Sequence, residues 1–297
     1  MSLSIRTAVL AVMASLVLAT VPMACQSGGI GDPCTPEEEV DALFVGFDIR
    51  QEYIESRSFQ CSTRICIVNH FQGRVSCPLG QPASAVKDCG GDGGPHEELC
   101  DKAKGEACRE SATLTIACSS AGDAACASFG GVCDTSRSIC VCGPDTVPPA
   151  GYHCTESDGV SLPKTFVCHV PGDCQQAGAD DAANAGKHCC VPGTDTPIGT
   201  PVCGQCEKKS KRDAVQAVYC SCRCGVAEGQ PDEPNFNFCS CPTGFTCSEL
   251  RPELGISDPQ LAGKYCIRDE TVYQDSPSAC GVVAGNHEEP CNGIGAL

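Results

Sequence analysis

The chain has 297 residues, a formal net charge of −17 and 29 cysteines, with no tryptophan and 5% aromatic residues. The acidic excess disfavours nucleic acid and anionic lipid surfaces as partners. About one residue in ten is cysteine, which is the composition of a disulfide scaffold, and the scarcity of other core-forming residues argues against one large hydrophobic core.

The N-terminus has the pattern of a bacterial signal peptide. Arg6 precedes an apolar run at residues 8–21, which is too short to span a bilayer core of ~30 Å as a helix. The run ends in VPMAC at residues 21–25. A small residue directly before a cysteine resembles the lipobox of bacterial lipoproteins, which implies cleavage before Cys25 and a diacylglycerol thioether on its thiol. Pro22 stands where that family favours leucine, and ordinary cleavage that leaves a free thiol is the alternative.

Cysteine parity supports lipidation of Cys25. Without it, 28 cysteines remain, an even number that can pair completely in an oxidising compartment. We therefore expect a signal peptide at residues 1–24 and a short flexible tether at residues 25–31. Gln26 resembles the residue that follows the cysteine in outer-membrane lipoproteins of Gram-negative bacteria, which implies an outer-membrane lipoprotein of the cell envelope, with secretion as the alternative.

Cysteines occur throughout the rest of the chain. This distribution predicts small disulfide-rich modules in tandem, built mostly of loops and short β-hairpins with one or two short helices. Each disulfide is expected to contribute ~2–4 kcal/mol by restricting the unfolded chain. Glycine and proline clusters place the module boundaries, which give modules at residues 32–82, 83–150, 151–200 and 201–297.

A few segments carry recognisable secondary-structure patterns. Residues 64–68 and 74–77, separated by a loop, predict a hairpin with cysteines on both arms. Residues 97–102 predict a helical turn with acidic residues at its start. Residues 207–219 are the best helix candidate, and residues 219–224 alternate as a strand that places three cysteines on one face.

Five segments each contain a cysteine: GDPCTPEEE at 31–39, ESRSFQC at 55–61, NHFQGRVSCP at 69–78, FCSCP at 238–242 and GKYC at 263–266. Together they resemble cysteine-rich exported lipoproteins of myxobacterial type. The resemblance implies export to the cell envelope and no particular molecular activity.

One cysteine cluster has the spacing of a metal or redox site. Cys203 and Cys206 form a Cys-x-x-Cys motif and precede Cys220, Cys222 and Cys224, so thiolates from this set could hold zinc. The first two could instead form a redox dithiol at a helix start. The export signal favours disulfides for all five, because oxidised thiols cannot bind a metal.

The sequence contains no nucleophile elbow, zincin motif, phosphate-binding glycine loop, EF-hand loop or Cys-x-x-Cys-His haem motif, and we expect no catalytic, cofactor-binding or metal-binding residue. Asp180-Asp181 and Glu288-Glu289 could hold calcium, although such pairs are typical of solvated surface. Residues 208–212 form a basic cluster that could contact an anionic polysaccharide, and a solvated helix face is the simpler interpretation.

These patterns predict a non-enzymatic protein, anchored in the membrane through an N-terminal lipid, with a structural or partner-binding role at the cell envelope. An extracellular protein or a polysaccharide is the expected partner, and nucleic acid is not. An extracellular protease inhibitor is the first alternative, because disulfide-stapled modules present rigid loops to enzymes. An envelope thiol or metal protein that uses Cys203 and Cys206 is the second.

Overall fold

A computed structural model describes residues 28–91, 94–111, 115–116, 118–149, 152–155, 159–161, 165–206, 212–231, 233, 235–251, 261–271, 282–283 and 286–290. These residues form short antiparallel strands joined by long loops, with two short α-helices. The predicted fold class, a disulfide-rich protein of loops and short β-hairpins with one or two short helices, is confirmed. Within this part of the chain, no helix is both long and apolar enough to cross a membrane.

A central three-stranded sheet has the order β1-β2-β11. Residues Cys66 and Val68 of the middle strand face one apolar cluster, while Ile67 between them faces another. The alternation follows the two-residue period of a strand, and it leaves the sheet buried on both faces. The helix α3 covers the first face and begins at Asp213, whose side chain accepts a hydrogen bond from the Gln216 backbone. The bounds are β1 (Glu52–Glu55), β2 (Ile65–Asn69), α3 (Ala214–Ala217) and β11 (Val218–Ser221).

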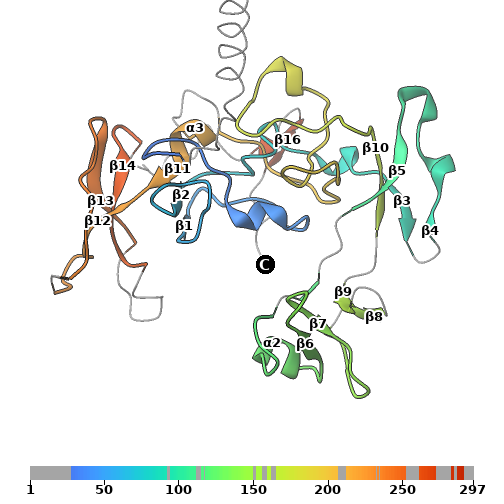
Figure 1. The fold of residues 1–297 in the computed structure, drawn as a ribbon. Coiled ribbons are helices and arrows are strands. Elements are labelled where there is room, and N and C mark those ends of the chain that lie inside the picture. The colour runs from blue at the N-terminus through green and yellow to red at the C-terminus, as the bar shows by residue number, and fades with distance from the viewer. Residues whose placement is uncertain are drawn as a thin grey trace, which may run out of the picture.

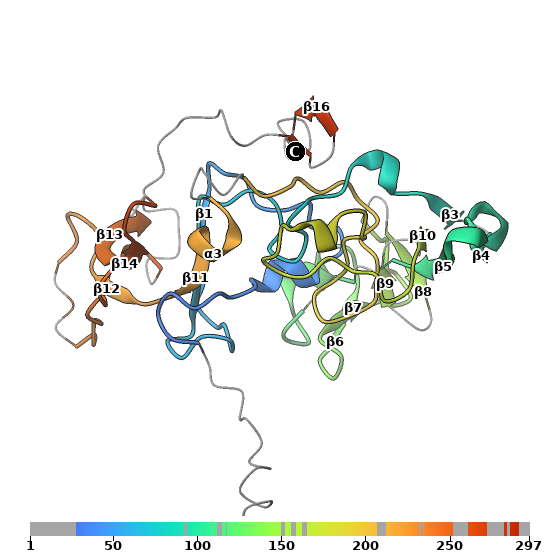
Figure 2. The same ribbon diagram turned by 90° about the horizontal axis from the view of Figure 1, so that it is seen from above.

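Two further sheets flank the central one, and Figures 1 and 2 show the three in a row. The sheet β12-β14-β13 packs on the central sheet through Tyr265 and Ile267. The sheet β4-β3-β10-β5 lies at the opposite end of the molecule. The bounds are β12 (Arg223–Gly225), β13 (Phe245–Arg251), β14 (Gly263–Arg268), β3 (Asp88–Gly91), β4 (Gly94–Pro95), β5 (Ala107–Glu110) and β10 (Phe166–His169).

Residues 115–161 form a separate small lobe, visible below the sheets in Figure 1. Its buried core consists of Val160 and four half-cystines, and the larger side chains Ile116, Phe129 and Tyr152 pack against it while remaining partly exposed. It contains α2 (Ala124–Ala127) and the hairpins β6 (Val132–Asp134) with β7 (Ile139–Val141) and β8 (His153–Thr155) with β9 (Gly159–Ser161). The remaining elements are β15 (Val282–Val283), β16 (Asn286–Pro290) and the 3-10 turns Glu37–Val40, Ala83–Ala85, Glu97–Leu99, Lys102–Lys104 and Ala182–Asn184.

The four expected modules are joined across their expected boundaries. Strand β2 from the first pairs with β11 from the last, in the register Cys66 opposite Cys220. The Cys61–Cys220 disulfide joins residues 159 positions apart, and the Cys77–Cys189 disulfide joins residues 112 positions apart. The chain therefore returns to its N-terminal part twice before it reaches the sheet β12-β14-β13.

The predicted hairpin is wrong in its second arm. Strand β2 forms where it was predicted, but its neighbours are β1 and β11. Residues 74–77 fold into a turn, with the Cys77 backbone N–H donating to the Arg74 carbonyl oxygen. The fully buried Arg74 side chain explains the difference, because its guanidinium donates hydrogen bonds to backbone carbonyls of the loop at residues 39–44. These contacts direct the segment toward that loop instead of back along β2.

Of the other predicted elements, one is confirmed and two are only partly correct. A 3-10 turn with acidic residues at its start forms at Glu97–Leu99, as predicted. Of the predicted helix at 207–219, only Ala214–Ala217 is helical, while residues 207–211 lie outside the described part. Val218 and Tyr219 belong to β11 instead, because pairing with β2 satisfies their backbone and buries both side chains. The predicted strand at 219–224 is divided between β11 and β12.

Candidate functional site

All 26 cysteines in the described part of the chain are disulfide-bonded. Cys220, Cys222 and Cys224 are bonded to three different partners, and Cys203 and Cys206 are in disulfides as well. The expectation of disulfides at these five residues is therefore confirmed. The pairs are 34–66, 61–220, 77–189, 89–108, 100–168, 118–133, 126–140, 142–154, 174–190, 222–239, 224–247 and 241–266.

Most of the other predicted residues, or their side chains, lie outside the part of the chain that the structure describes. Cys25, the expected lipidation site, lies outside the described residues, as do Lys208–Lys211 and the side chains of Glu288 and Glu289. Asp181 caps a 3-10 turn, since its carboxylate accepts a hydrogen bond from the Ala183 backbone. Arg212 is buried and donates to the backbone carbonyls of Asn69 and Thr271, so it is not part of a solvated basic face.

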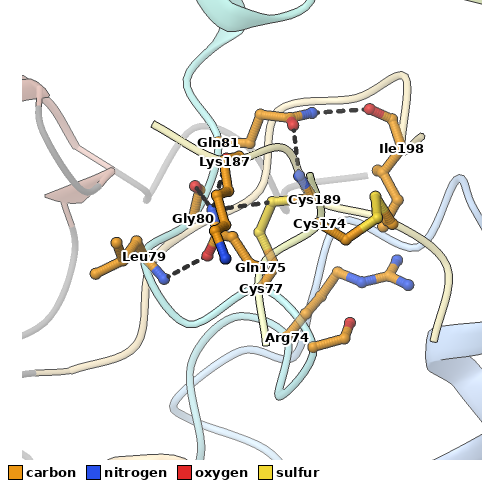
Figure 3. The surroundings of a disulfide bond; sticks show 12 residues. Arg74, Cys77, Leu79, Gly80, Gln81, Cys174, Gln175, Lys187, Cys189 and Ile198 are labelled. Carbon is orange, nitrogen blue, oxygen red and sulfur yellow. Dashed lines mark hydrogen bonds between the residues drawn. A yellow bond between two sulfur atoms is a disulfide. The ribbon is translucent and has the colours of Figure 1, made fainter. Parts of the chain in front are cut away.

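A pocket of about 390 Å³ lies beside the Cys77–Cys189 disulfide, where two segments nearly a hundred residues apart meet (Figure 3). Its size falls within the range of small-molecule sites. Apolar groups form most of the pocket wall, which also contains the cationic Lys187 and the titratable His188. The lining residues are Leu79, Gly80, Gln81, Pro82 and Ala85 on one side and Gln175, Ala185, Gly186, Lys187 and His188 on the other.

Two buried glutamines tie the pocket walls together (Figure 3). Gln81 accepts a hydrogen bond of 3.0 Å from the Cys189 backbone and donates one of 2.8 Å to the Ile198 carbonyl. Gln175 accepts one of 3.0 Å from the Leu79 backbone and donates one of 3.1 Å to the Gly80 carbonyl. A buried amide is costly unless its donors and acceptors are satisfied, and these partners satisfy both. The disulfide and the two amides together make the pocket preformed.

Close backbone approach on one wall requires glycine at position 80. The Gly80 φ angle is +70°, in the left-handed region, and a Cβ there would lie 2.4 Å from the Gly204 backbone nitrogen. The Gln81 backbone pairs with Val202 through hydrogen bonds of 2.7 and 2.8 Å in the same stretch. The segment at residues 202–204 therefore supports the pocket from behind.

The electrostatics of the pocket depend on Lys187 and His188. Burial lowers the pKa of His188 below its ordinary value, and the neighbouring His169 lowers it further, which favours the neutral imidazole. Lys187 is half-buried, and among the described residues no carboxylate lies within ion-pair distance of its Nζ. The pocket thus combines apolar walls with one cation, which suits an apolar group that carries an anion.

The sequence interpretation did not identify this pocket. Gln81 and Gln175 stand 94 positions apart and belong to no motif, and His188 belongs to none either. The adjacent pair Cys189-Cys190 was the one available signal. Its two members bond to Cys77 and to Cys174, so this short stretch is held from both sides.

Comparisons with protein-family models, with curated proteins and with solved structures find no match for this chain.

Proposed function

We propose that the protein is an exported, lipid-anchored binding protein of the bacterial cell envelope, and that it acts without catalysis. The pocket between residues 79–85 and 175–188 is its binding site, and it takes an apolar or aromatic group that carries an anionic end. A surface protein or polysaccharide that carries such a group is the natural partner. The preformed pocket is the observation that carries this proposal.

The disulfide content supports the proposed location at the cell envelope. Disulfides form and persist in oxidising environments, and every described cysteine is disulfide-bonded. The apolar run at residues 8–21 and the Ala24-Cys25 junction supply the export and anchoring signals. Lipidation at Cys25 followed by a flexible tether would hold the folded part near the membrane surface.

The anchor is tested by fractionation and intact mass. The wild-type protein should stay with the membrane fraction and carry a diacyl mass increment on Cys25. Cys25→Ala should be released in soluble form with its disulfides unchanged. Retention of Cys25→Ala in the membrane fraction, or an unmodified Cys25 in the native protein, would remove the anchoring part of the proposal.

The pocket is tested with 8-anilinonaphthalene-1-sulfonate, an anionic aromatic probe whose fluorescence rises in apolar sites. Ala185→Trp fills the pocket and should weaken probe binding at least ~10-fold, while Lys187→Gln removes the cation and should weaken it by a few-fold. Val147→Ala, an exposed position in the small lobe, is the matched control and should change nothing. Equal binding by all four proteins would reject the pocket as the binding site.

Partner capture is tested on intact cells with a photo-crosslinking residue at Pro82, on the pocket wall, and with the same residue at Val147 as control. One discrete adduct from position 82, lost in the Ala185→Trp background, supports a partner-binding role. Turnover of a substrate that a single substitution in the pocket abolishes would instead make the protein an enzyme.

Protease inhibition remains a second candidate because of the loop that carries Phe59. The Phe59 side chain is 80% exposed, although the residues around it are firmly held. Ser58 is buried and its backbone N–H donates to the Arg64 carbonyl oxygen, while Gln60 exchanges two hydrogen bonds with the Thr35 backbone. Cys61 then fastens the loop to Cys220. A rigid loop that presents one aromatic side chain suits the apolar specificity pocket of a chymotrypsin-type protease.

This candidate predicts inhibition of chymotrypsin and not of trypsin. Phe59→Ala should raise the inhibition constant at least ~10-fold, and Phe59→Lys should transfer inhibition to trypsin. Phe236→Ala, which removes another exposed phenylalanine, is the control. Absence of inhibition by the wild-type protein would end this candidate without bearing on the pocket.

A further inference from the structure

The Cys174–Cys190 disulfide lies against a histidine and a carboxylate. Cys190 Sγ is 3.9 Å from His169 Nε2, and Cys174 Sγ is 3.8 Å from Asp195 Oδ1. His169 Nε2 is 3.2 Å from the same Asp195 oxygen. All four donor atoms lie within 4.8 Å of one another. Two sulfurs, an imidazole nitrogen and a carboxylate oxygen form the type of donor set that zinc prefers in proteins.

Backbone structure holds each of these donors in place. His169 ends β10 and pairs with Ala107 of β5. Cys174 forms a bridge with His188, and Cys190 forms one with Pro197. The Asp195 oxygen that faces His169 also accepts a 2.6 Å hydrogen bond from the Gly172 backbone. The cluster is thus assembled by the tertiary structure from segments separated along the chain.

Among the described residues, one ring nitrogen of His169 lacks a partner, and it is Nδ1 rather than the Nε2 atom that faces the cluster. The His169 side chain has no exposed surface, and its Nδ1 atom has no hydrogen-bond partner in the described part of the molecule. An unsatisfied buried polar atom costs about 1–3 kcal/mol and calls for an explanation. Packing against a disulfide would not require an imidazole at this position, since an apolar side chain would fill the space without that cost.

We propose that Cys174, Cys190, His169 and Asp195 form a zinc site that the disulfide keeps closed and that reduction opens. A dithiol donates two electrons and two protons to the Cys174–Cys190 bond, which becomes two thiols while the dithiol becomes a disulfide. Zn²⁺ then replaces the two thiol protons, which pass to solvent. The two thiolates, the His169 imidazole and the Asp195 carboxylate complete four-coordination.

The required movements are small. Zinc bonds of ~2.3 Å to sulfur and ~2.0–2.2 Å to nitrogen or oxygen place tetrahedral donors about 3.3–3.8 Å apart. The nitrogen and oxygen already lie near this spacing, and the Cα atoms of the cysteines are 5.5 Å apart. Rotation of the two cysteine side chains can therefore separate the sulfurs without moving the backbone.

The surroundings leave this disulfide more accessible to a reductant than the buried Cys77–Cys189 disulfide. Cys174 is half-buried and the Asp195 side chain is 37% exposed, so a reductant can approach, whereas Cys77 and Cys189 are both fully buried. Arg109 lies 3.4 Å from the outer Asp195 oxygen and offsets the negative charge of two thiolates and a carboxylate. The cysteine cluster at residues 34, 61 and 220 contains no histidine or carboxylate and would require two disulfides to open.

The test uses the intact protein, limited reduction with a phosphine reductant, and ZnCl₂ as the probe. Differential alkylation should show released thiols at Cys174 and Cys190. One bound zinc per chain, measured by elemental analysis after desalting, should protect both thiols from alkylation. A Cys174–Cys190 bond that stays intact under conditions that keep the fold, or no zinc retention after its reduction, would overturn the proposal.

Two variants separate ligation from folding. His169→Gln and Asp195→Asn keep side-chain size and leave the disulfide able to form, and each should weaken zinc retention at least ~10-fold with an unchanged circular dichroism spectrum. The paired change Cys126→Ser with Cys140→Ser removes a disulfide of similar loop length in the small lobe and should leave zinc binding intact. Equal zinc retention in His169→Gln, Asp195→Asn and wild type would refute the assignment. Cobalt substitution gives a second readout, because thiolate-to-cobalt absorption reports the two sulfurs directly.

Discussion

The central sheet and the small lobe at residues 115–161 use disulfides in opposite ways. In the lobe, the three bonds span 12, 14 and 15 positions and close only local loops. Around the central sheet, Cys61–Cys220 and Cys77–Cys189 span 159 and 112 positions and hold distant segments together. The central region also has apolar clusters on both faces of its sheet, whereas the lobe core is largely sulfur. In the lobe, local disulfides take the place of a hydrophobic core. In the central region, long-range disulfides bring together the strands whose side chains form the hydrophobic core.

The largest expected difference comes from removing one disulfide in each region. In the chain-entropy estimate, Cys61→Ala with Cys220→Ala costs about 5 kcal/mol of the free energy of unfolding, and Cys126→Ala with Cys140→Ala costs about 3 kcal/mol. The longer loop leaves the unfolded chain more freedom. Urea unfolding of the two double variants checks the order. Equal losses, or a larger loss in the lobe, would show that loop length does not distinguish the two regions.

A second comparison sets a buried arginine against an exposed one. Arg74 is fully buried beside Glu39, and Arg74→Met leaves the backbone carbonyls of Glu39, Asp41 and Phe44 without their donor. The expected loss is ~3–5 kcal/mol of unfolding free energy. Arg137 in the lobe contacts Asp134 on the surface, so Arg137→Met should cost less than about 1 kcal/mol. Denaturant titration measures the loss of unfolding free energy in both variants. Similar losses would contradict the expectation that the buried Arg74 stabilises the fold more than the exposed Arg137 does.

The smallest expected effect is an opposite response to pH. Hydrogen bonds from Ser136 and Arg137 lower the pKa of Asp134 to about 2. Its stabilising contribution is present above its ordinary pKa of 3.8 and is lost as the pH falls toward 2. Burial raises the pKa of Glu39 above 4.5. The Glu39 contribution is therefore complete below pH 4.5 and is lost as the pH rises through the raised value.

Hydrogen exchange followed by mass spectrometry resolves the two regions. As the pH falls from 4 to 2, amides of the β6–β7 hairpin should lose protection, and Asp134→Asn should abolish that change. As the pH rises above 4.5, amides near Val75 should lose protection, since the Glu39 carboxyl accepts hydrogen bonds from Val75 and Ser76. Loss of protection in the same direction in both regions would contradict the opposite pKa shifts of Asp134 and Glu39.

Local patterns were predictable wherever a short segment decides its own structure. Strand β2 and the turn at Glu97–Leu99 follow from β-branched and acidic residues that act within a few positions. The second hairpin arm was not predictable, because the contacts that direct Arg74 lie 30 to 35 positions away. Likewise, the helix predicted at 207–219 gives way to a strand at Val218 because β2 is available as its partner.

By itself, the sequence determined that this is a disulfide-built chain of loops and short strands, because composition alone shows that apolar burial is too small to hold it. The tertiary structure decided which cysteines pair, since 28 cysteines allow on the order of 10^14 full pairings and none is marked by spacing. The tertiary structure also forms the pocket beside Cys77–Cys189 and the cluster around His169. The pocket joins segments nearly a hundred positions apart, and the cluster joins loop and strand-end positions between 169 and 195, so neither is marked by spacing along the chain.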